Sequence, residues 1–208
     1  MRKISVLSFC LSLGVFGCSN APHVDTTPNQ MAEGQDYPPG PYGYVTGTVM
    51  QNIKFLGKSD PAGATAGAMD YSTLPLAPVS LGDFHKDPNV KYVVLSGVAG
   101  WCTPCNDEQP TVVAASKKYE ALGFRFFEAL IQGYNHTTGA PATENDLNKW
   151  QHAHSLHVGL GLDPEDKIHE YADIAAFPLN MVVRTSDMQI VFMQVGEMDL
   201  DPILASFH

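Results

Sequence analysis

The spacing of apolar residues predicts alternating strands and helices in the second half of the chain. Short β-branched and aromatic runs at 91–98 and 124–131 are typical of strands buried on both faces of a sheet. After Pro104 the apolar spacing becomes helical, and a second helical pattern covers 144–155. Shorter elements are expected further on, namely a strand at 157–162, a helical turn at 164–171, two strands at 179–184 and 189–195, and a last helix at 199–207.

This order of elements predicts one α/β domain, which we assign to residues 75–208. Strands that alternate with helices form a central mixed β-sheet with helices on both faces. The chain has 208 residues, of which 44% are hydrophobic, and this is enough apolar material for one core but not for two. Residues 42–74 form an N-terminal extension, in which β-forming residues on both sides of Gln51-Asn52 predict a β-hairpin over 42–56.

The segment before this extension has the composition of a flexible tether. Residues 18–41 are poor in large aliphatic side chains and rich in Pro, Asn and Gln. Such a segment buries too little surface to offset the entropy lost on ordering. We therefore expect 18–41 to link the domain flexibly to whatever holds its N-terminus.

Residues 1–17 have the pattern of a secretory signal peptide. A basic start at Arg2-Lys3 precedes an apolar run, 4–16, that is too short to span a bilayer as a permanent helix. Its end, Val-Phe-Gly-Cys, resembles a bacterial lipobox, which implies that Cys18 is lipidated. The alternative is an ordinary signal peptide that is cut elsewhere and leaves Cys18 as an odd thiol.

With a lipid on Cys18, the protein is expected on the periplasmic side of a bacterial membrane, held there only by its lipid anchor. Ser19 favours the outer membrane by resemblance to a bacterial sorting rule. The formal net charge is -10, with a pI near 5.1. This charge argues against nucleic acid or an anionic membrane surface as a partner, because both require a concentrated basic field.

The four cysteines reduce to one pair in the mature domain. Cys10 leaves with the signal peptide and Cys18 carries lipid, so Cys102 and Cys105 remain. In an oxidising compartment such a pair forms either a structural disulfide or a redox-active one.

The motif Trp101-Cys102-Thr103-Pro104-Cys105 lies where a predicted buried strand runs into a helix. A thiolate at a helix N-terminus faces free backbone N–H groups and the positive end of the helix dipole, which lower its pKa. Cys102 is therefore the expected attacking sulfur, and Cys105, one turn further, resolves the mixed disulfide. Pro104 suits the first helical turn, where its missing N–H is not needed.

A Cys-x-x-Cys pair also occurs in zinc sites, which need two more ligands. The chain has no second such pair, and the nearest histidines lie at 152, 154 and 157. On a helix His152 and His154 project to different faces and cannot chelate one ion together. We interpret these histidines, and His136, as surface or partly buried polar residues, and we expect no metal or other cofactor.

The motif closely resembles the Trp-Cys-x-Pro-Cys site of the thioredoxin superfamily. The continuation, with Glu108 and Pro110 in a Cys-x-x-Glu-x-Pro pattern, resembles the exported TlpA/ResA-like branch. The resemblance covers about residues 79–206 and implies a thioredoxin-like fold without a cofactor. It implies thiol–disulfide exchange with other exported proteins and recycling by a membrane redox partner, with reduction favoured over oxidation.

The resemblance also implies roles for individual residues. Pro178 matches a cis-proline that packs against the active-site disulfide, beside Trp101 and Pro104. Phe177 and Thr103 are then expected to contact the substrate, since a cis bond turns the preceding backbone toward an added substrate strand. A trans proline at the start of an edge strand is the alternative for Pro178.

The sequence departs from that family at two positions. Ser96 stands where an acidic or amide side chain assists proton transfer, and Gly97 stands where an aromatic residue is usual. Glu108 is a candidate substitute acid or base, although an exposed helix carboxylate is the favoured interpretation.

Three alternatives to an oxidoreductase stay open on the sequence. They are a copper- or zinc-binding chaperone on the same frame, a non-catalytic surface lipoprotein with a structural disulfide, and a thiol peroxidase. The last is disfavoured because Thr103 and Pro104 follow the first cysteine of the motif rather than precede it.

Overall fold

The computed structural model describes residues 36–59, 73–137, 139–163, 167–171 and 176–207. The signal peptide at 1–17, the lipidation of Cys18 and the tether up to residue 35 are predictions that lie outside the described residues. Within the described ranges, no helix combines the length and the apolar character needed to cross a bilayer.

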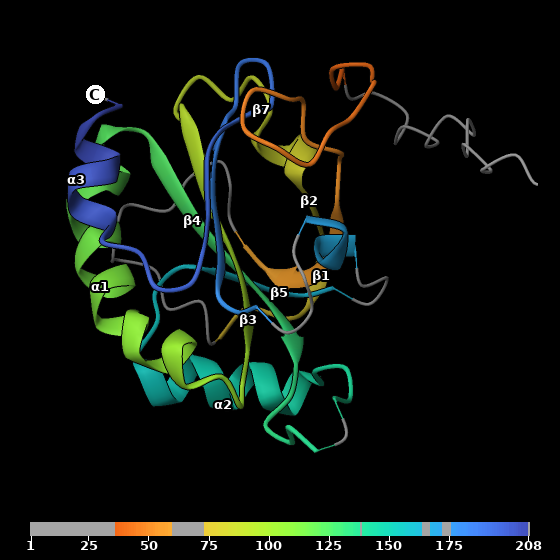
Figure 1. Ribbon diagram of the computed structural model, residues 1–208, viewed down its shortest axis with the longest axis vertical. Coiled ribbons are helices and arrows are strands. Elements are labelled where there is room, and N and C mark those ends of the chain that lie inside the picture. Colours follow the sequence, from red (N-terminus) through yellow and green to blue (C-terminus); the bar gives the residue numbers. More distant parts are fainter. Residues whose placement is uncertain (1–35, 60–72, 138, 164–166, 172–175, 208) are drawn as a thin grey trace, which may run out of the picture. The chain divides into compact units, whose positions relative to one another are not determined.

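The centre of the structure is a mixed seven-stranded sheet with the order β2-β1-β5-β4-β3-β6-β7 (Figure 1). The neighbouring strands β3, β4 and β5 run parallel, and the remaining pairs are antiparallel. This confirms the predicted mixed sheet. The strands are β1 (Lys54–Lys58), β2 (Ala77–Ser80), β3 (Tyr92–Ala99), β4 (Phe124–Gln132), β5 (Gly159–Leu162), β6 (Leu179–Arg184) and β7 (Gln189–Val195).

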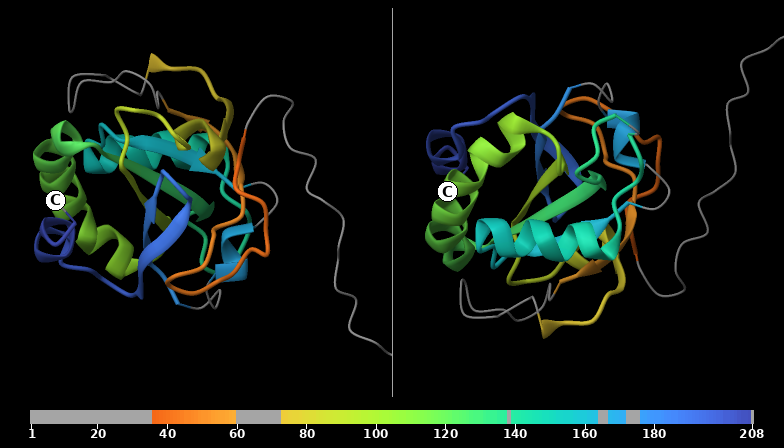
Figure 2. Two further views of the ribbon diagram at one scale, coloured as in Figure 1. Left: turned by 90° about the horizontal axis from the view of Figure 1, so that it is seen from above. Right: turned by 90° about the horizontal axis from the view of Figure 1, so that it is seen from below.

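The α-helices gather on one face of the sheet. The two parallel crossovers, β3-α1-β4 and β4-α2-β5, step in the same direction, and right-handed crossovers then place both helices on one side. Helix α3 packs beside α1 (Figure 2). The helices are α1 (Thr103–Tyr119), α2 (Glu144–His154) and α3 (Leu200–Ala205), with 3-10 helices η2 (Leu81–Phe84), η3 (Glu120–Leu122) and η4 (Lys167–Tyr171).

In the described residues, the opposite face of the sheet carries 3-10 helices, including η4. A Cβ added at Gly97 would lie 3.4 Å from the Cδ1 atom of Ile168, so η4 packs directly over β3. Phe84 of η2 packs on Phe127 of β4 on this same face, so helical segments lie on both faces, as predicted, and those described on the far face are 3-10 helices (Figure 2).

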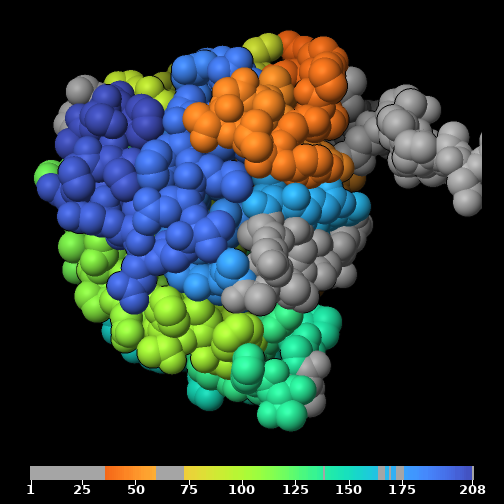
Figure 3. Space-filling view, in the orientation of Figure 1, coloured from red at the N-terminus to blue at the C-terminus, as the bar shows by residue number. Residues whose placement is uncertain are grey.

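The predicted hairpin over 42–56 is wrong. Only β1 is a strand in this region, and it pairs with β2 and with β5. The residues before it pair instead with the distant strand β7, where the Gly47 amide donates to the Ile190 carbonyl and the Ile190 amide donates to the Thr48 carbonyl. Figure 3 shows this segment, in orange, against the blue C-terminal strands. The β-forming composition was recognised, but the partners were too distant in sequence for local turn signals to identify.

The end of the predicted tether also differs from expectation, because Tyr37 belongs to the core. Its side chain is 3% exposed, and its hydroxyl donates to the Met50 carbonyl at 2.8 Å. The Tyr37 ring also lies 5.6 Å from the ring of His85. One buried aromatic residue therefore holds the last part of this proline-rich segment on the domain.

Candidate functional site

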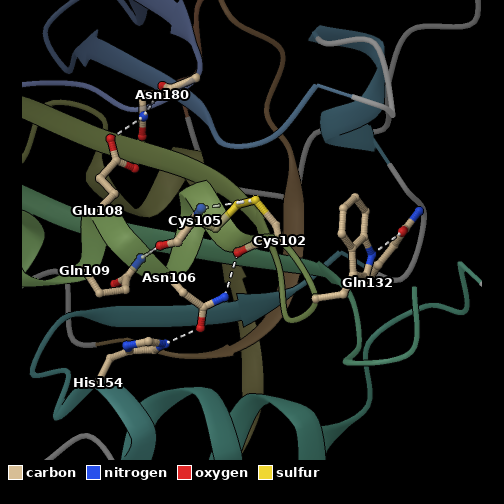
Figure 4. The surroundings of a disulfide bond; sticks show 10 residues. Cys102, Cys105, Asn106, Glu108, Gln109, Gln132, His154 and Asn180 are labelled. Atoms are coloured by element: carbon tan, nitrogen blue, oxygen red, sulfur yellow. Dashed lines mark hydrogen bonds between the residues drawn. A yellow bond between two sulfur atoms is a disulfide. The ribbon is translucent and has the colours of Figure 1, made fainter. Parts of the chain in front are cut away.

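The Trp-Cys-Thr-Pro-Cys motif lies at the junction of β3 and α1, as the sequence predicts. Cys102 is the N-cap of α1, and it forms a disulfide with Cys105 in the first turn (Figure 4). The Cys105 amide donates to the Cys102 sulfur at 3.1 Å. Pro104 occupies the first turn, where no N–H donor is required. The fold thus directs a backbone donor and the helix dipole at the Cys102 sulfur, which favours its thiolate form.

The two cysteines are buried in the disulfide form, whereas the two residues between them are exposed to solvent. Cys102 is 2% exposed and Cys105 is 0% exposed. Thr103 and Pro104 are exposed, and they flank Cys102 where a partner chain would approach.

The backbone of Cys102 is fixed by a residue that the sequence interpretation missed. The Asn106 side chain donates to the Cys102 carbonyl at 2.6 Å, and the Asn106 Oδ1 atom lies 3.1 Å from Nε2 of His154 on α2 (Figure 4). Burial lowers the pKa of His154, which favours the neutral ring. His154 was correctly read as a partly buried polar residue, but its link to the motif was not foreseen. The spacing of four residues from Cys102 to Asn106 was the available signal.

Trp101 forms an aromatic surface beside the disulfide. Its indole N–H donates to Oε1 of Gln132 on β4 at 2.8 Å. Its ring centroid lies 4.2 Å from that of His136 and 6.0 Å from that of Phe177. His136 is exposed, so this surface is open to a partner.

The Phe177–Pro178 peptide bond is cis, as the resemblance implied. Phe177 is buried against Trp101, and Pro178 directly precedes β6, whose first residue pairs with Gly97 on β3. The Pro178 carbonyl accepts a hydrogen bond from the Gly196 amide at 2.8 Å. The structure therefore brings Phe177 and Pro178 to the motif across about 75 residues of sequence.

Beneath the disulfide lies a polar row, which we define as Ser96, Glu108, Gln109, Glu128 and Asn180. Strand register aligns Ser96 with Glu128 on β4 and with Asn180 on β6, and residues in register share one face of a sheet. The Ser96 hydroxyl donates to Asn180 Oδ1 at 2.7 Å. Asn180 Nδ2 in turn donates to Glu108 Oε1 at 2.8 Å (Figure 4). Ser96 is therefore not itself an acid, but its hydroxyl is linked through the Asn180 side-chain amide to the buried carboxyl group of Glu108.

The interpretation of Glu108 as an exposed helix carboxylate is wrong, because its side chain is only 4% exposed. Glu108 lies three residues after buried Cys105 and so shares its face of α1. Its Oε1 atom also accepts from the Met198 amide at 2.7 Å, whereas Oε2 has no partner. Burial raises the pKa of Glu108, and the two donors oppose this rise.

Glu128 is a second buried acid that the sequence interpretation missed. The side chain is 1% exposed, and the indole N–H of Trp150 on α2 donates to its Oε2 atom at 2.7 Å. Burial raises the pKa of Glu128 to about 7. The available signal was a charged residue within the buried run Phe-Arg-Phe-Phe-Glu-Ala-Leu-Ile-Gln of β4.

A zinc ion bound by the two cysteines would need two more ligands. Among the residues that the structure describes, no group of three or more His, Cys, Asp or Glu side chains is arranged to hold a metal ion.

Comparison with solved structures identifies the architecture. A thioredoxin domain of a thiol-disulfide oxidoreductase from Bacteroides vulgatus superposes with a TM-score of 0.57 at 19% identity, covering 79% of this chain and 99% of that one. The chain has the thioredoxin fold. A thiol:disulfide interchange protein, DsbE, from Chlorobium tepidum gives a TM-score of 0.57 at 18% identity, with 80% and 100% of the chains covered.

The exposed lipoprotein thioredoxin of Streptococcus pneumoniae shares the thioredoxin fold at 18% identity and a TM-score of 0.51, with 75% of this chain and 97% of that chain covered. No family model and no curated protein sequence matches the chain. At these identities the likeness concerns the fold, so the activity must be argued from the site itself.

Proposed function

We propose that this protein is a thiol–disulfide oxidoreductase that exchanges disulfides with other exported proteins. The observation that carries the proposal is the Cys102–Cys105 disulfide at the N-terminus of α1, with a backbone N–H directed at the Cys102 sulfur. An aromatic surface around Trp101 and the Phe177–Pro178 segment adjoin it. The solved structures with the same fold include thiol-disulfide oxidoreductases, which supports the same chemistry here.

The exchange needs two sulfur displacements. In the reducing direction the Cys102 thiolate attacks a substrate disulfide, forms a mixed disulfide and releases one substrate thiolate. The Cys105 thiolate then attacks the Cys102 sulfur, which closes the protein disulfide and releases the second substrate thiolate. The substrate gains the two electrons that the protein dithiol loses, and the reverse sequence oxidises a substrate dithiol.

The surroundings divide the remaining tasks among named residues. The backbone at Phe177 and the exposed Thr103 contact the substrate chain, and Trp101 supplies an aromatic surface beside them, against which the buried Phe177 ring packs. Glu108 is the candidate acid or base, because it is buried one turn behind Cys105 and has one unpartnered oxygen. No cofactor takes part in this scheme.

We further propose that the protein acts outside the cytoplasm, anchored through lipid on Cys18, and that a membrane redox protein recycles it. The signal-peptide pattern of 1–17 and the likeness to an exposed lipoprotein thioredoxin support this location. Labelling with radioactive palmitate in a bacterial host tests the anchor: the wild-type chain incorporates label, and the Cys18→Ala variant does not.

Insulin reduction tests the activity. The purified protein with dithiothreitol is expected to accelerate insulin precipitation well above the rate with dithiothreitol alone, because its thiolate is the better nucleophile. Cys102→Ser abolishes this acceleration. Cys105→Ser instead traps mixed disulfides, which are visible as adducts on non-reducing gels. Equal rates for the wild type and Cys102→Ser would show that the disulfide is only structural.

A further inference from the structure

Glu128 has an incomplete set of hydrogen bonds for an ionised group at its depth. Trp150 donates to Oε2 at 2.7 Å, whereas the buried Oε1 atom has no partner at normal hydrogen-bond geometry. The Gln109 amide also favours the carboxylate, as Trp150 does, but burial at 1% exposure outweighs both donors, and neutralisation by a proton removes most of the cost of burial.

Two adjacent members of the polar row lack donors as well. The Gln109 side-chain amide faces the Glu128 carboxyl group as a hydrogen-bond donor, and its Nε2 atom also donates to the Cys105 carbonyl at 3.0 Å. The Gln109 Oε1 atom is then a buried acceptor without a donor, and so is Glu108 Oε2. A proton on Glu128 adds one more donor to a row in which these buried oxygens have none.

The electrostatic surroundings of Glu128 also favour that proton. Glu108 on α1 contributes a like charge, and no lysine or arginine in the described part of the chain offsets it. His154 lies behind the Trp150 ring at 4.4 Å between centroids, and its pKa is lowered by burial. The groups that face Glu128 are thus one acid and neutral side chains, namely Glu108 and Gln109 of α1, Trp150 of α2, Ser96 of β3 and Leu160 of β5.

We propose that Glu128 is a positioning residue that takes up and releases a proton in step with the Cys102–Cys105 couple. It acts on Cys105 through Gln109, which joins the Glu128 carboxyl group to the Cys105 backbone. This inference rests on the redox function proposed above and names the residue that stores the proton of that reaction.

The proton balance of the exchange defines the role of Glu128. When a substrate dithiol reduces the protein, the protein disulfide breaks, the substrate disulfide forms, and the substrate loses two protons with two electrons. Cys105 takes one proton, and Cys102 stays a thiolate. The new negative charge at Cys102 raises the proton affinity of Glu128, which takes the second proton if it was ionised beforehand.

The pH dependence of the reduction potential tests this coupling. The potential is measured by equilibration with glutathione or dithiothreitol buffers over about two pH units on either side of pH 7 and quantified by thiol alkylation. Between about pH 7 and the higher pKa that Glu128 has in the reduced protein, the wild type takes up as much as one extra proton per electron pair. One extra proton changes the equilibrium constant for reduction of the protein by a further factor of ten per pH unit, which corresponds to about 30 mV in the reduction potential.

Three variants make the test specific. Glu128→Gln keeps an acceptor for Trp150 and loses the extra pH dependence. Trp150→Phe removes a donor that favours the carboxylate, so the extra dependence begins at higher pH. Glu144→Gln changes an exposed acid at the start of α2 and behaves as the wild type.

Infrared spectroscopy of the oxidised wild type provides a second measurement that needs no variant. A band from a protonated buried carboxyl group is expected below about pH 7 and is lost above it. The inference is overturned if Glu128→Gln and the wild type have the same potential curve, or if the band does not titrate. If the wild type fails to reduce insulin but its potential curve differs from that of Glu128→Gln, only the proposed function is refuted. If the wild type reduces insulin and the two potential curves coincide, only the role of Glu128 is refuted.

Discussion

Replacement of Glu128 by Gln is expected to change how the folding stability depends on pH. The native pKa of Glu128 is about 7, against 4.5 for a free side chain. Between these values the native state binds a proton that the unfolded state lacks, so the free energy of unfolding falls as the pH rises. The interval spans about 2.5 pH units at about 1.4 kcal/mol for each, which gives about 3 kcal/mol.

The Glu128→Gln variant lacks this loss, because its amide does not titrate. Urea unfolding of the oxidised proteins, followed by tryptophan fluorescence, measures the difference. The variant gains about 3 kcal/mol relative to the wild type between pH 4.5 and pH 7 and gains nothing further above that range. Glu108 contributes a slope of the same sign, but it is present in both proteins.

A constant difference between the two proteins across this pH range would refute the reasoning, since it would show that Glu128 is ionised in the native state throughout. Glu144→Gln serves as the matched control, because this exposed carboxyl group lies outside the polar row. Its curve should run parallel to that of the wild type.

Three further substitutions probe other parts of the structure. Asn180→Leu removes a donor to buried Glu108 and should cost about 1–3 kcal/mol in urea unfolding; a wild-type midpoint would show that this hydrogen bond is dispensable. Gly57→Ala places a Cβ against the Leu160 carbonyl oxygen and should cost about 1–3 kcal/mol, whereas unchanged stability would argue against the pairing of β1 with β5. Because burial lowers the pKa of His154, the unfolded state binds a proton on this side chain at a higher pH than the native state does, and wild-type stability falls as the pH drops through the histidine range. His154→Gln should lack this loss in thermal unfolding, and identical pH profiles for the two proteins would contradict the argument.

The parts of the site that are close together in sequence could be predicted from the sequence. The strand, the two cysteines and the helix that follows them are consecutive, so composition and spacing were enough to place Cys102 at an N-terminus with Cys105 one turn later. The same holds for the strand pair 179–184 and 189–195, which a short turn joins and which the structure reproduces with identical bounds. Local propensity and adjacency decide such features without long-range information.

Tertiary structure alone decided which polar groups lie under the disulfide. Ser96, Glu128 and Asn180 come from three different strands, and only the register of the sheet sets them side by side. A shift of one residue in that register would turn each side chain to the opposite face of the sheet. The pairing of β1 with distant strands and the burial of Tyr37 likewise depend on contacts between remote segments, which local composition does not encode. The sequence by itself thus determined the reactive pair, and the packing of the sheet against α1 and α2 determined the buried acids that accompany it.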